Sequence, residues 1–374
     1  MLKRLTHLFF RIGAALLLAA SSAAHADNDT IVIGQAIDLS GPNASIGRDY
    51  VAGIKTYFDM VNSVGGINGK RVQYIVRDDQ GRPEISARAA SELIEQEHVE
   101  YLFGSVGDDT VRAVLEAPAF KRSGHILFAP LAAADYASGA RVLFWRPGYK
   151  QELRHIFDHF SKLGISDIGI AYQDSPANQE AYRSLSALIQ ERRIKLTGTA
   201  RIAVDNQVAK EAASLAASKP GFVLVIADTI STALFLKEFR KHNAQTFVAG
   251  TSLINLSTLN ELAGARAAEW TVFSQVVPSP TSGTTLIQLE HLNMMKKYRD
   301  EAVSSLTLEG FAAAKALGKA IQQAKRGNRS ALPELMAQRR TIDLGGLTMA
   351  PGNNNRLSNY LDIALFRKGS GLVF

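Results

Sequence analysis

Three short segments combine small residues with hydroxyl, amide or carboxylate side chains, which is the chemistry of a pocket for a polar molecule. Small residues let a backbone approach a ligand closely, and the polar side chains can donate or accept hydrogen bonds. Each segment follows an apolar run and precedes a helical pattern, so its backbone N–H groups are expected at a helix start, where they are unpaired. Helix capping alone would explain about half of these residues. The segments are 38–47, 104–110 and 130–135.

A histidine pair offers a different chemistry. His155 and His159 stand four residues apart with Asp158 between them, a spacing found in some zinc proteases. The apolar residues Leu153 and Ile156 mark the buried face of the same helix, so the histidines are expected toward solvent, and no third ligand is evident. The chain has no Cys, no nucleophile elbow and no phosphate-binding loop. We therefore expect no enzyme activity, no metal and no cofactor.

The elements that must position these segments alternate between short β-branched runs and amphipathic stretches, which indicates an α/β fold with largely parallel sheets. A first unit runs to about residue 147, and a second unit of the same kind starts near residue 150. Strands are expected at 30–39, 71–77, 101–105, 126–131, 168–173, 196–202, 222–227, 246–250, 271–277, 360–366 and 372–374. Helices are expected at 47–63, 83–97, 110–122, 150–163, 178–193, 206–218, 230–242, 285–299 and 306–325.

No linker rich in Pro, Gly or Ser separates the two units, so we expect two doubly wound α/β lobes joined by three hinge crossings. The crossings are predicted at 144–148, 275–278 and 344–347. The C-terminal tail is then shared between the lobes. Lobe 1 is predicted to contain 27–147 with 278–345, and lobe 2 to contain 148–277 with 346–374.

The first 26 residues have the pattern of an export signal: a basic front, an apolar stretch and the small-x-small site Ala24-His25-Ala26. Removing this segment, which carries three of the basic residues and no acidic one, lowers the formal net charge from +7 to +4. The remaining Lys and Arg are scattered, so binding to nucleic acid is not expected. We predict an exported protein that is cleaved after Ala26 and resides in the periplasm.

Several motifs, taken in order, resemble the leucine/isoleucine/valine-binding-protein-like family of type I periplasmic solute-binding proteins. The resemblance covers nearly the whole chain after the export signal. The motifs are Ile31-Val32-Ile33-Gly34, Leu39-Ser40-Gly41-Pro42, Gly47, Tyr57-Phe58-Asp59-Met60-Val61-Asn62, Gly65-Gly66-Ile67-Asn68-Gly69-Lys70, Asp78-Asp79, Phe144-Trp145-Arg146, Tyr172-Gln173-Asp174, Gln275-Val276-Val277-Pro278, Leu308-Glu309-Gly310-Phe311 and Ala314-Lys315.

The resemblance implies two lobes that close on a small polar solute and deliver it to the permease of an ABC importer in the inner membrane. It also implies that donors of lobe 1 hold a ligand carboxylate, while an acidic or aromatic group of lobe 2 faces the ammonium or side chain. We expect a monomer. Carried over by position, the predicted ligand-binding residues are Ser40, Asn43, Ser105, Gly107, Asp108, Thr110, Leu131, Ala132, Ala133, Arg146, Tyr149, Tyr172, Asp174, Asp228 and Gln275.

Individual roles follow from the side chains. Arg146 is expected to pair with a carboxylate, Tyr149 to stack or donate, and Asp108 or Asp109 to take a cation. The structural alternatives are a hinge salt bridge for Arg146, helix capping for the Ser, Asn and Asp residues, and packing between the lobes for the tyrosines.

The sequence departs from the family pattern at places that bear on the ligand. Ala132-Ala133 replaces a hydroxyl-bearing residue, Asp108-Asp109 replaces a hydroxyl-rich turn, and a Tyr-Gly pair is missing after Asp174. Unless they cap the helix of Thr110, two added carboxylates would repel the carboxylate of an α-amino acid. The ligand therefore stays open among a branched-chain amino acid-like solute, an amide and an organic or aromatic acid. A periplasmic sensor of the same fold and an exported hydrolase remain as alternative functions.

Overall fold

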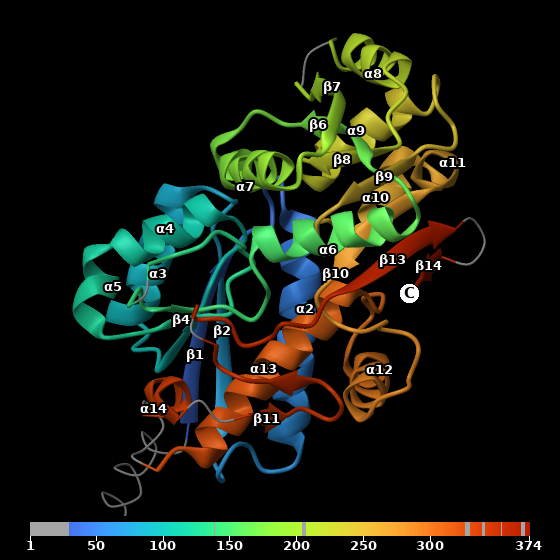
Figure 1. Cartoon of the computed structure of the whole chain (residues 1–374). Coiled ribbons are helices and arrows are strands. Elements are labelled where there is room, and N and C mark those ends of the chain that lie inside the picture. Colours follow the sequence, from blue (N-terminus) through green and yellow to red (C-terminus); the bar gives the residue numbers. More distant parts are fainter. Residues whose placement is uncertain are drawn as a thin grey trace, which may run out of the picture.

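In the computed structural model, the described residues are 30–137, 139–203, 207–325, 330–338, 341–352, 354–367 and 371–374. The predicted export signal, residues 1–26, lies outside them. The described chain forms two lobes, each with its own sheet and helices on both faces, which confirms the predicted doubly wound α/β fold (Figure 1). Among these residues, none of the helices has the length and apolar character that a membrane span requires.

Lobe 1 is built on a parallel sheet in the order β2-β1-β3-β4-β5. Because helices cover both faces, the central strands are apolar along nearly their whole length. The strands are β1 (Thr30–Ile37), β2 (Arg71–Asp78), β3 (Tyr101–Phe103), β4 (Leu127–Phe128) and β5 (Val142–Leu143). One face carries α2 (Ala44–Ser63), α12 (Leu286–Tyr298), α13 (Ser305–Gln323) and α14 (Ala331–Gln338), and the other carries α3 (Pro83–Glu95), α4 (Asp108–Glu116) and α5 (Pro118–Ser123).

Lobe 2 has the sheet order β14-β13-β10-β9-β8-β6-β7, in which the C-terminal strands add antiparallel to a parallel core. The strands are β6 (Asp167–Tyr172), β7 (Lys195–Arg201), β8 (Phe222–Ile226), β9 (Phe247–Gly250), β10 (Thr271–Gln275), β13 (Asp362–Arg367) and β14 (Gly371–Val373). One face carries α6 (Tyr149–Lys162) and α7 (Pro176–Arg192), and the other carries α8 (Val208–Ala217), α9 (Thr229–Phe239), α10 (Leu256–Ala263) and α11 (Ala265–Ala268).

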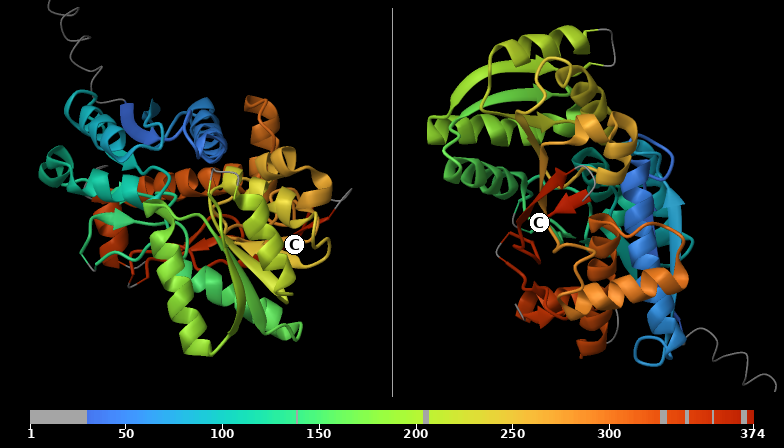
Figure 2. Two further views of the ribbon diagram at one scale, coloured as in Figure 1. Left: turned by 90° about the horizontal axis from the view of Figure 1, so that it is seen from above. Right: turned by 90° about the vertical axis from the view of Figure 1, so that its right-hand side faces the viewer.

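The chain passes between the lobes three times, but the third passage is not where the sequence placed it. The segment predicted as a crossing, 344–347, is the turn between β11 (Ile342–Asp343) and β12 (Thr348–Met349). Its two glycines have φ values of +102° and +90°, and its leucines are buried in the core of lobe 1. The chain leaves lobe 1 only after Leu357, which is also in that core, and enters β13 of lobe 2 (Figure 2). The described residues from 346 to 352 and from 354 to 357 therefore lie with lobe 1.

A second difference concerns the stretch expected as one helix at 110–122. The structure has two helices there, because Pro118 forces the preceding Ala117 into an extended conformation with ψ of 132°. Helix α4 also begins two residues earlier than expected, directly after Gly107. This earlier start sets Gly107 at the helix N-terminus, where it faces the space between the lobes.

Candidate functional site

A cavity of about 260 Å³ lies between the lobes, at the carboxyl ends of the parallel strands of both sheets. Lobe 1 contributes the loops after β1, β2 and β3, and lobe 2 contributes the loops after β6, β8 and β9 together with the start of α6. We call this cavity the cleft. Its lining residues are Pro42, Asn43, Ile46, Gly81, Val106, Gly107, Tyr149, Gln173, Ser175, Asn178, Ala181, Val225, Ile226, Ala227, Asp228, Thr251, Leu253 and Ile254.

Five helices begin at the cleft. The residues that precede α2, α4, α7 and α9 are Asn43, Gly107, Ser175 and Asp228, and all four line the cavity, as does Tyr149, the first residue of α6. The first-turn N–H groups of a helix are unpaired within the helix and carry partial positive charge. Of the described residues that line the cleft, none is Lys, Arg or His. The helix starts therefore supply the positive potential of the cleft.

The lobe 1 side of the cleft is held in shape by a buried carboxylate. Asp38 accepts hydrogen bonds from the backbone N–H groups of Gly41, at 2.6 Å, and Asn43, at 2.8 Å. Gly47 packs so closely against this turn that a Cβ atom would lie 1.9 Å from the Asp38 carbonyl oxygen. The side chain of Asn43 makes no capping bond to α2. It is therefore available to a molecule in the cleft.

Asp108 lies one layer below the surface of the cleft. Its side chain is buried and accepts a hydrogen bond of 3.0 Å from the backbone N–H of Ala134. Burial raises the pKa of this carboxyl group, and hydrogen bonds from Ala134 and the Tyr149 hydroxyl partly oppose that rise. Burial and the neighbouring Asp108 also raise the pKa of Tyr149 well above its usual value. Asp108 thus supports the ring of Tyr149, which faces the cleft.

The lobe 2 side of the cleft is a polar network centred on Gln173, which follows β6. The Gln173 side-chain oxygen accepts from the Asn178 amide at 3.0 Å and from the Asp228 backbone N–H at 3.2 Å. Asp228 caps α9 by accepting from the Ser231 N–H at 2.7 Å. Neither Gln173 nor Asn178 was among the predicted site residues. The strand-end rule that selected the lobe 1 turns would have found Gln173 if it had been applied to β6.

Four of the predicted residues meet in the cleft: Asn43, Gly107, Tyr149 and Asp228. Gln275 lines a different cavity, described below. The others are not in the cleft lining, and several have structural partners. Ser40 donates to Asp78 at 2.6 Å, and Asp174 pairs with Arg201 at 3.4 Å.

Other predicted residues are fixed in the interior. Ser105 is buried and donates to the carboxylate of Asp79. The Thr110 hydroxyl donates to the carbonyl oxygens of Val106 and Gly107, at 2.8 and 2.7 Å, from within the first turn of α4. The Tyr172 ring packs against Tyr182, with 4.9 Å between centroids. The remaining three, Leu131, Ala132 and Ala133, are buried among core residues.

Arg146 forms a buried ion pair at the hinge instead of reaching the cleft. Its guanidinium donates to both carboxylate oxygens of Glu309, at 3.1 and 2.6 Å, and to the Ser252 hydroxyl at 2.9 Å. Glu152 lies beside this pair and accepts from the Ser252 N–H and the Ser274 hydroxyl. Burial raises the pKa of Glu309, and Arg146 opposes the rise. The hinge salt bridge, which the sequence left as the alternative, is thus the arrangement observed.

The histidine pair on α6 lies outside the cleft lining. Asp158 is exposed and pairs with Arg192 at 2.5 Å. Across the part of the chain that the structure describes, no group of three His, Cys, Asp or Glu side chains is arranged to hold a metal ion.

The sequence matches the family described as Periplasmic binding protein over residues 30–369. It is 30% identical over 121 residues to Leu/Ile/Val-binding protein homolog 3 of Brucella melitensis, which is 32% of this chain and 31% of that protein. It is 37% identical over 92 residues to an amino acid binding protein of Pseudomonas aeruginosa, which is 24% of each chain. The alignments thus span about a third or less of these curated relatives.

Solved structures extend the similarity to most of the chain. A substrate-binding periplasmic protein from Ralstonia solanacearum matches with a TM-score of 0.83 at 24% identity, over 92% of this chain and 99% of that one. The branched-chain amino acid transporter substrate binding protein LivJ from Streptococcus pneumoniae, in complex with isoleucine, matches with a TM-score of 0.79 at 16% identity, with the same coverage. At such identities these matches establish the fold alone. With the family match over residues 30–369, they show that the chain belongs to the periplasmic binding protein family and is of its leucine/isoleucine/valine-binding-protein-like type.

Proposed function

We propose that this protein is the periplasmic solute-binding component of an ABC importer and that its cleft binds a small amphipathic carboxylate. The observation that carries the proposal is the convergence of five helix starts on one cavity between two lobes, with no cationic side chain among the described lining residues. A carboxylate is the common small anion that suits such N–H groups. Export, cleavage after Ala26, delivery to an inner-membrane permease, action as a monomer and the absence of catalysis belong to the same proposal.

The rest of the cleft supports an amphipathic ligand. Ile46, Val106 and Leu253 offer apolar contacts, while Asp228, Gln173 and Tyr149 offer acceptors or donors for an ammonium or hydroxyl group. A cavity of about 260 Å³ suits a molecule of amino-acid size. Asp108 is buried and Asp109 does not line the cleft, so the repulsion expected from these two carboxylates is reduced. Branched-chain amino acids and related organic or aromatic acids are therefore the leading candidates.

The ligand class is tested by thermal shift on the protein without its export signal, followed by calorimetry. The panel pairs each branched-chain amino acid with its amide, which lacks the carboxylate, and with its hydroxy acid, which lacks the ammonium; aromatic acids complete it. Binding to the folded form raises the melting temperature. We expect stabilisation by at least one acid and loss of binding with its amide. The proposal fails if no acid stabilises the protein, or if the amide binds as well as the acid.

A matched pair of variants tests the location. Tyr149→Phe removes the hydroxyl through which Asp108 holds the ring of Tyr149 at the cleft, and Tyr172→Phe removes one from a residue outside the cleft lining. We expect Tyr149→Phe to weaken ligand binding by roughly 1 kcal/mol, the net value of one hydrogen bond, and Tyr172→Phe to leave it unchanged. Uptake of the labelled ligand by cells that carry each variant then separates an importer component from a sensor. A sensor would alter signalling without altering uptake.

A further inference from the structure

A buried arginine lies at the hinge, where two of the passages between the lobes run side by side. Arg356 stands at the start of the third passage, next to the first. The Phe144 N–H of the first passage donates to the Asn355 carbonyl, and the Leu357 N–H donates to the Phe144 carbonyl, both at 2.8 Å. The two passages are thus joined by backbone hydrogen bonds on either side of Arg356.

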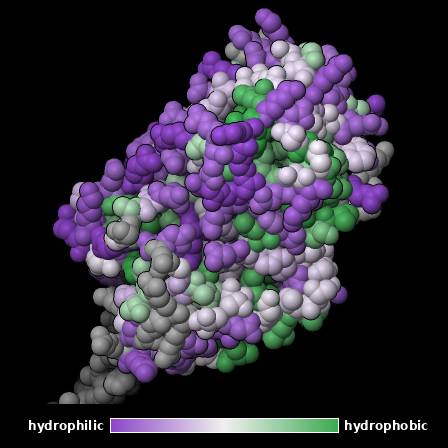
Figure 3. All heavy atoms as spheres, viewed as in Figure 1, coloured by the Kyte–Doolittle hydropathy of each residue, from purple (hydrophilic) through white to green (hydrophobic). Residues whose placement is uncertain are grey.

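The burial of Arg356 is unusual for a charged side chain. Hydrophilic residues cover much of the face that Figure 3 shows, where water solvates them. Arg356 is instead only 2% exposed, and its guanidinium lies 4.6 Å from the centre of the Phe144 ring. Asp135 pairs with it at 3.3 Å, but the side chain of Asp135 is 76% exposed. A buried charge is costly unless other groups compensate it, so the remaining contacts of the guanidinium are decisive.

Three backbone carbonyl groups hold the guanidinium of Arg356. Its Nη1 donates to the Arg146 carbonyl oxygen at 2.8 Å. Its Nη2 donates to the carbonyl oxygens of Ala133, at 3.1 Å, and Ala134, at 2.7 Å. Arg146 belongs to the first passage, and the two alanines belong to the turn that follows β4. Arg356 therefore ties this turn of lobe 1 to the hinge.

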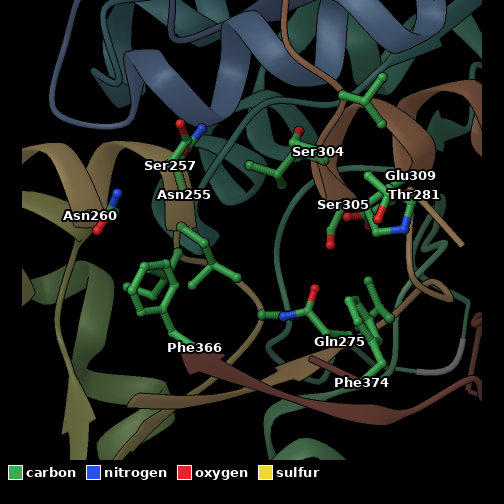
Figure 4. Close-up of a pocket in the computed structure, with 17 residues that line it drawn as sticks. Asn255, Ser257, Asn260, Gln275, Thr281, Ser304, Ser305, Glu309, Phe366 and Phe374 are labelled. Carbon is green, nitrogen blue, oxygen red and sulfur yellow. The ribbon is translucent and has the colours of Figure 1, made fainter. Parts of the chain in front are cut away.

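The side chain of Arg146 serves a different part of the hinge. It pairs with Glu309, which lines a second cavity between the lobes together with Gln275 (Figure 4). This cavity has a volume of about 370 Å³, and of its described lining residues only Ile254 also lines the cleft. The two buried arginines of the hinge thus hold different regions: Arg146 holds a wall of the second cavity, and Arg356 holds the turn after β4.

One peptide group of this turn lies between two buried charges. Its carbonyl oxygen, on Ala133, accepts from Arg356, and its N–H, on Ala134, donates to the Asp108 carboxylate at 3.0 Å. Hydrogen bonds in such a chain polarise and strengthen one another, because the buried surroundings have a low dielectric constant. The cation and the anion therefore fix the orientation of the same peptide group from its two ends.

Tyr149, which lines the cleft, is held by this peptide group and by this carboxylate. Its backbone N–H donates to the Ala133 carbonyl oxygen at 3.0 Å, and its hydroxyl donates to Asp108. The neighbouring Gly148 is closely packed, since a Cβ atom there would lie 3.1 Å from Nη2 of Arg356. The backbone and the ring of Tyr149 thus both depend on the turn that Arg356 holds.

We propose that Arg356 is a positioning residue for the cleft: it orients the peptide group of Ala133 and Ala134, and through Asp108 it fixes the ring of Tyr149 against the ligand. Arg356 is not among the described residues that line the cleft, so its effect on binding is indirect. The inference rests on the ligand binding proposed for the cleft. It adds that a residue of the hinge determines the shape of the cleft wall.

Arg356→Lys tests this role, because lysine keeps the charge but lacks the fork of donors that reaches several carbonyl groups at once. NMR of the protein labelled at the Cζ carbon of tyrosine reports the surroundings of each ring, and Tyr149→Phe identifies the Tyr149 signal by its absence. We expect Arg356→Lys to shift or broaden that signal. In calorimetry with leucine and with benzoate, we expect the acid that binds the parent protein to bind this variant about tenfold more weakly.

Arg240→Lys is the matched control. Arg240 also donates to the carbonyl oxygens of four residues and lies over a phenylalanine ring, but it follows the end of α9 that is remote from the cleft. Its replacement should lower stability in urea while leaving the Tyr149 signal and the ligand affinity unchanged. Equal effects of the two variants on Tyr149, or an unchanged Tyr149 signal in Arg356→Lys, would each overturn the proposal.

A milder variant serves if Arg356→Lys does not fold. Phe144→Leu removes the ring beneath the guanidinium but keeps an apolar side chain in the core. It is also expected to move the Tyr149 signal, and an unmoved signal would contradict the role of Arg356.

A double-mutant cycle with Asp108→Asn tests the route. If Arg356 acts through Asp108, Arg356→Lys shifts the Tyr149 signal less in the Asp108→Asn background than in the parent protein. Equal shifts in the two backgrounds would exclude Asp108 as the intermediate. If no acid of the panel binds the parent protein, the function proposed for the cleft fails, and the NMR comparison still decides whether Arg356 positions Tyr149.

Discussion

At the scale of single residues, buried ionisable side chains affect the stability of the fold more than exposed ones do. Arg146 and Glu309 have side-chain exposures of 0% and 2%, and Glu152 lies in contact with the same network. The mutual attraction of such a pair offsets the cost of removing two charges from water, so loss of one partner leaves a buried charge unpaired. The pair also joins the first passage between the lobes to α13 of lobe 1. Its role is to stabilise the hinge.

We predict that Arg146→Met lowers the free energy of unfolding by about 3–5 kcal/mol, because it leaves the Glu309 carboxylate buried without its partner. Urea denaturation of the ligand-free protein measures this change. Arg154→Met is the control: this side chain is 40% exposed and pairs with Glu191 at 2.6 Å, so its loss should cost less than about 1 kcal/mol. Equal effects of the two substitutions would show that the hinge pair contributes no special stability.

His291 is a second buried residue with a measurable consequence. Its ring is inaccessible to solvent, packs edge-on against Phe311 at 5.6 Å, and neither ring nitrogen has a hydrogen-bond partner among the described residues. Burial lowers the pKa of His291 from 6.5 to about 4. The unfolded chain therefore binds a proton at a higher pH than the folded chain does. Stability from this residue is present above about pH 6.5 and is lost as the pH falls toward 4.

Between about pH 7 and about pH 5, we expect His291 to lower the free energy of unfolding by roughly 2 kcal/mol. Carboxyl groups with raised pKa values, such as Glu309, act in the opposite direction, so the comparison with a variant isolates the histidine. His291→Leu should remove the acid-induced loss, and its free energy of unfolding should rise relative to the parent protein as the pH falls. Parallel pH profiles for the two proteins would contradict this assignment.

At the scale of elements, the contact between α2 and α13 determines how lobe 1 closes over its sheet. The two helices meet at glycines: a Cβ atom on Gly53 would lie 2.0 Å from the Thr307 carbonyl oxygen, and one on Gly310 would lie 2.2 Å from the Tyr50 carbonyl oxygen. The helix backbones are thus in direct contact. This approach also positions Glu309, the neighbour of Gly310, to reach Arg146.

Gly310→Ala should therefore destabilise lobe 1, even though alanine is the better helix former by about 1 kcal/mol. The added methyl group forces the helices apart, and overpacking of this kind costs about 1–3 kcal/mol or more. Thermal or urea unfolding measures the effect. Lys319→Ala, a partly exposed position on the same helix, is the control and should change stability by less than about 0.5 kcal/mol. A stabilised Gly310→Ala variant would show that the helices can separate freely.

For the whole molecule, a polar bridge joins the two lobes in the observed arrangement. The Asn255 amide of lobe 2 donates to the Ser45 carbonyl and the Asp49 carboxylate of lobe 1, both at 3.1 Å. The Ser304 hydroxyl donates to the same carboxylate at 2.8 Å. Burial raises the pKa of Asp49, and these hydrogen bonds oppose the rise. The bridge lies outside the cleft lining, so it can favour closure without touching a cleft ligand.

Asn255→Ser tests this bridge. Serine can still cap α10, as the Asn255 side chain does through the Thr258 N–H, but it is too short to span the lobes. We expect the cleft ligand to bind about 5–30-fold more weakly, because the variant loses one or two hydrogen bonds that join the lobes and would favour closure. Small-angle scattering of the ligand-free variant should show a larger radius of gyration. Unchanged affinity and radius would remove the bridge as a determinant of closure.

The sequence by itself determined the two-lobed α/β organisation and part of the cleft. Strand and helix periodicity and strand-end turns are local signals, so they placed Asn43 and Gly107 at helix starts that the structure brings together, and the family resemblance added Asp228. Only the tertiary structure decided what lies beside those starts. Arg146 pairs with Glu309, which is 163 positions away in the sequence, and is therefore a residue of the hinge. Residues 344–347 form a turn because their leucines pack into the core of lobe 1. Partners so distant in the sequence leave no local pattern, because packing alone brings them together.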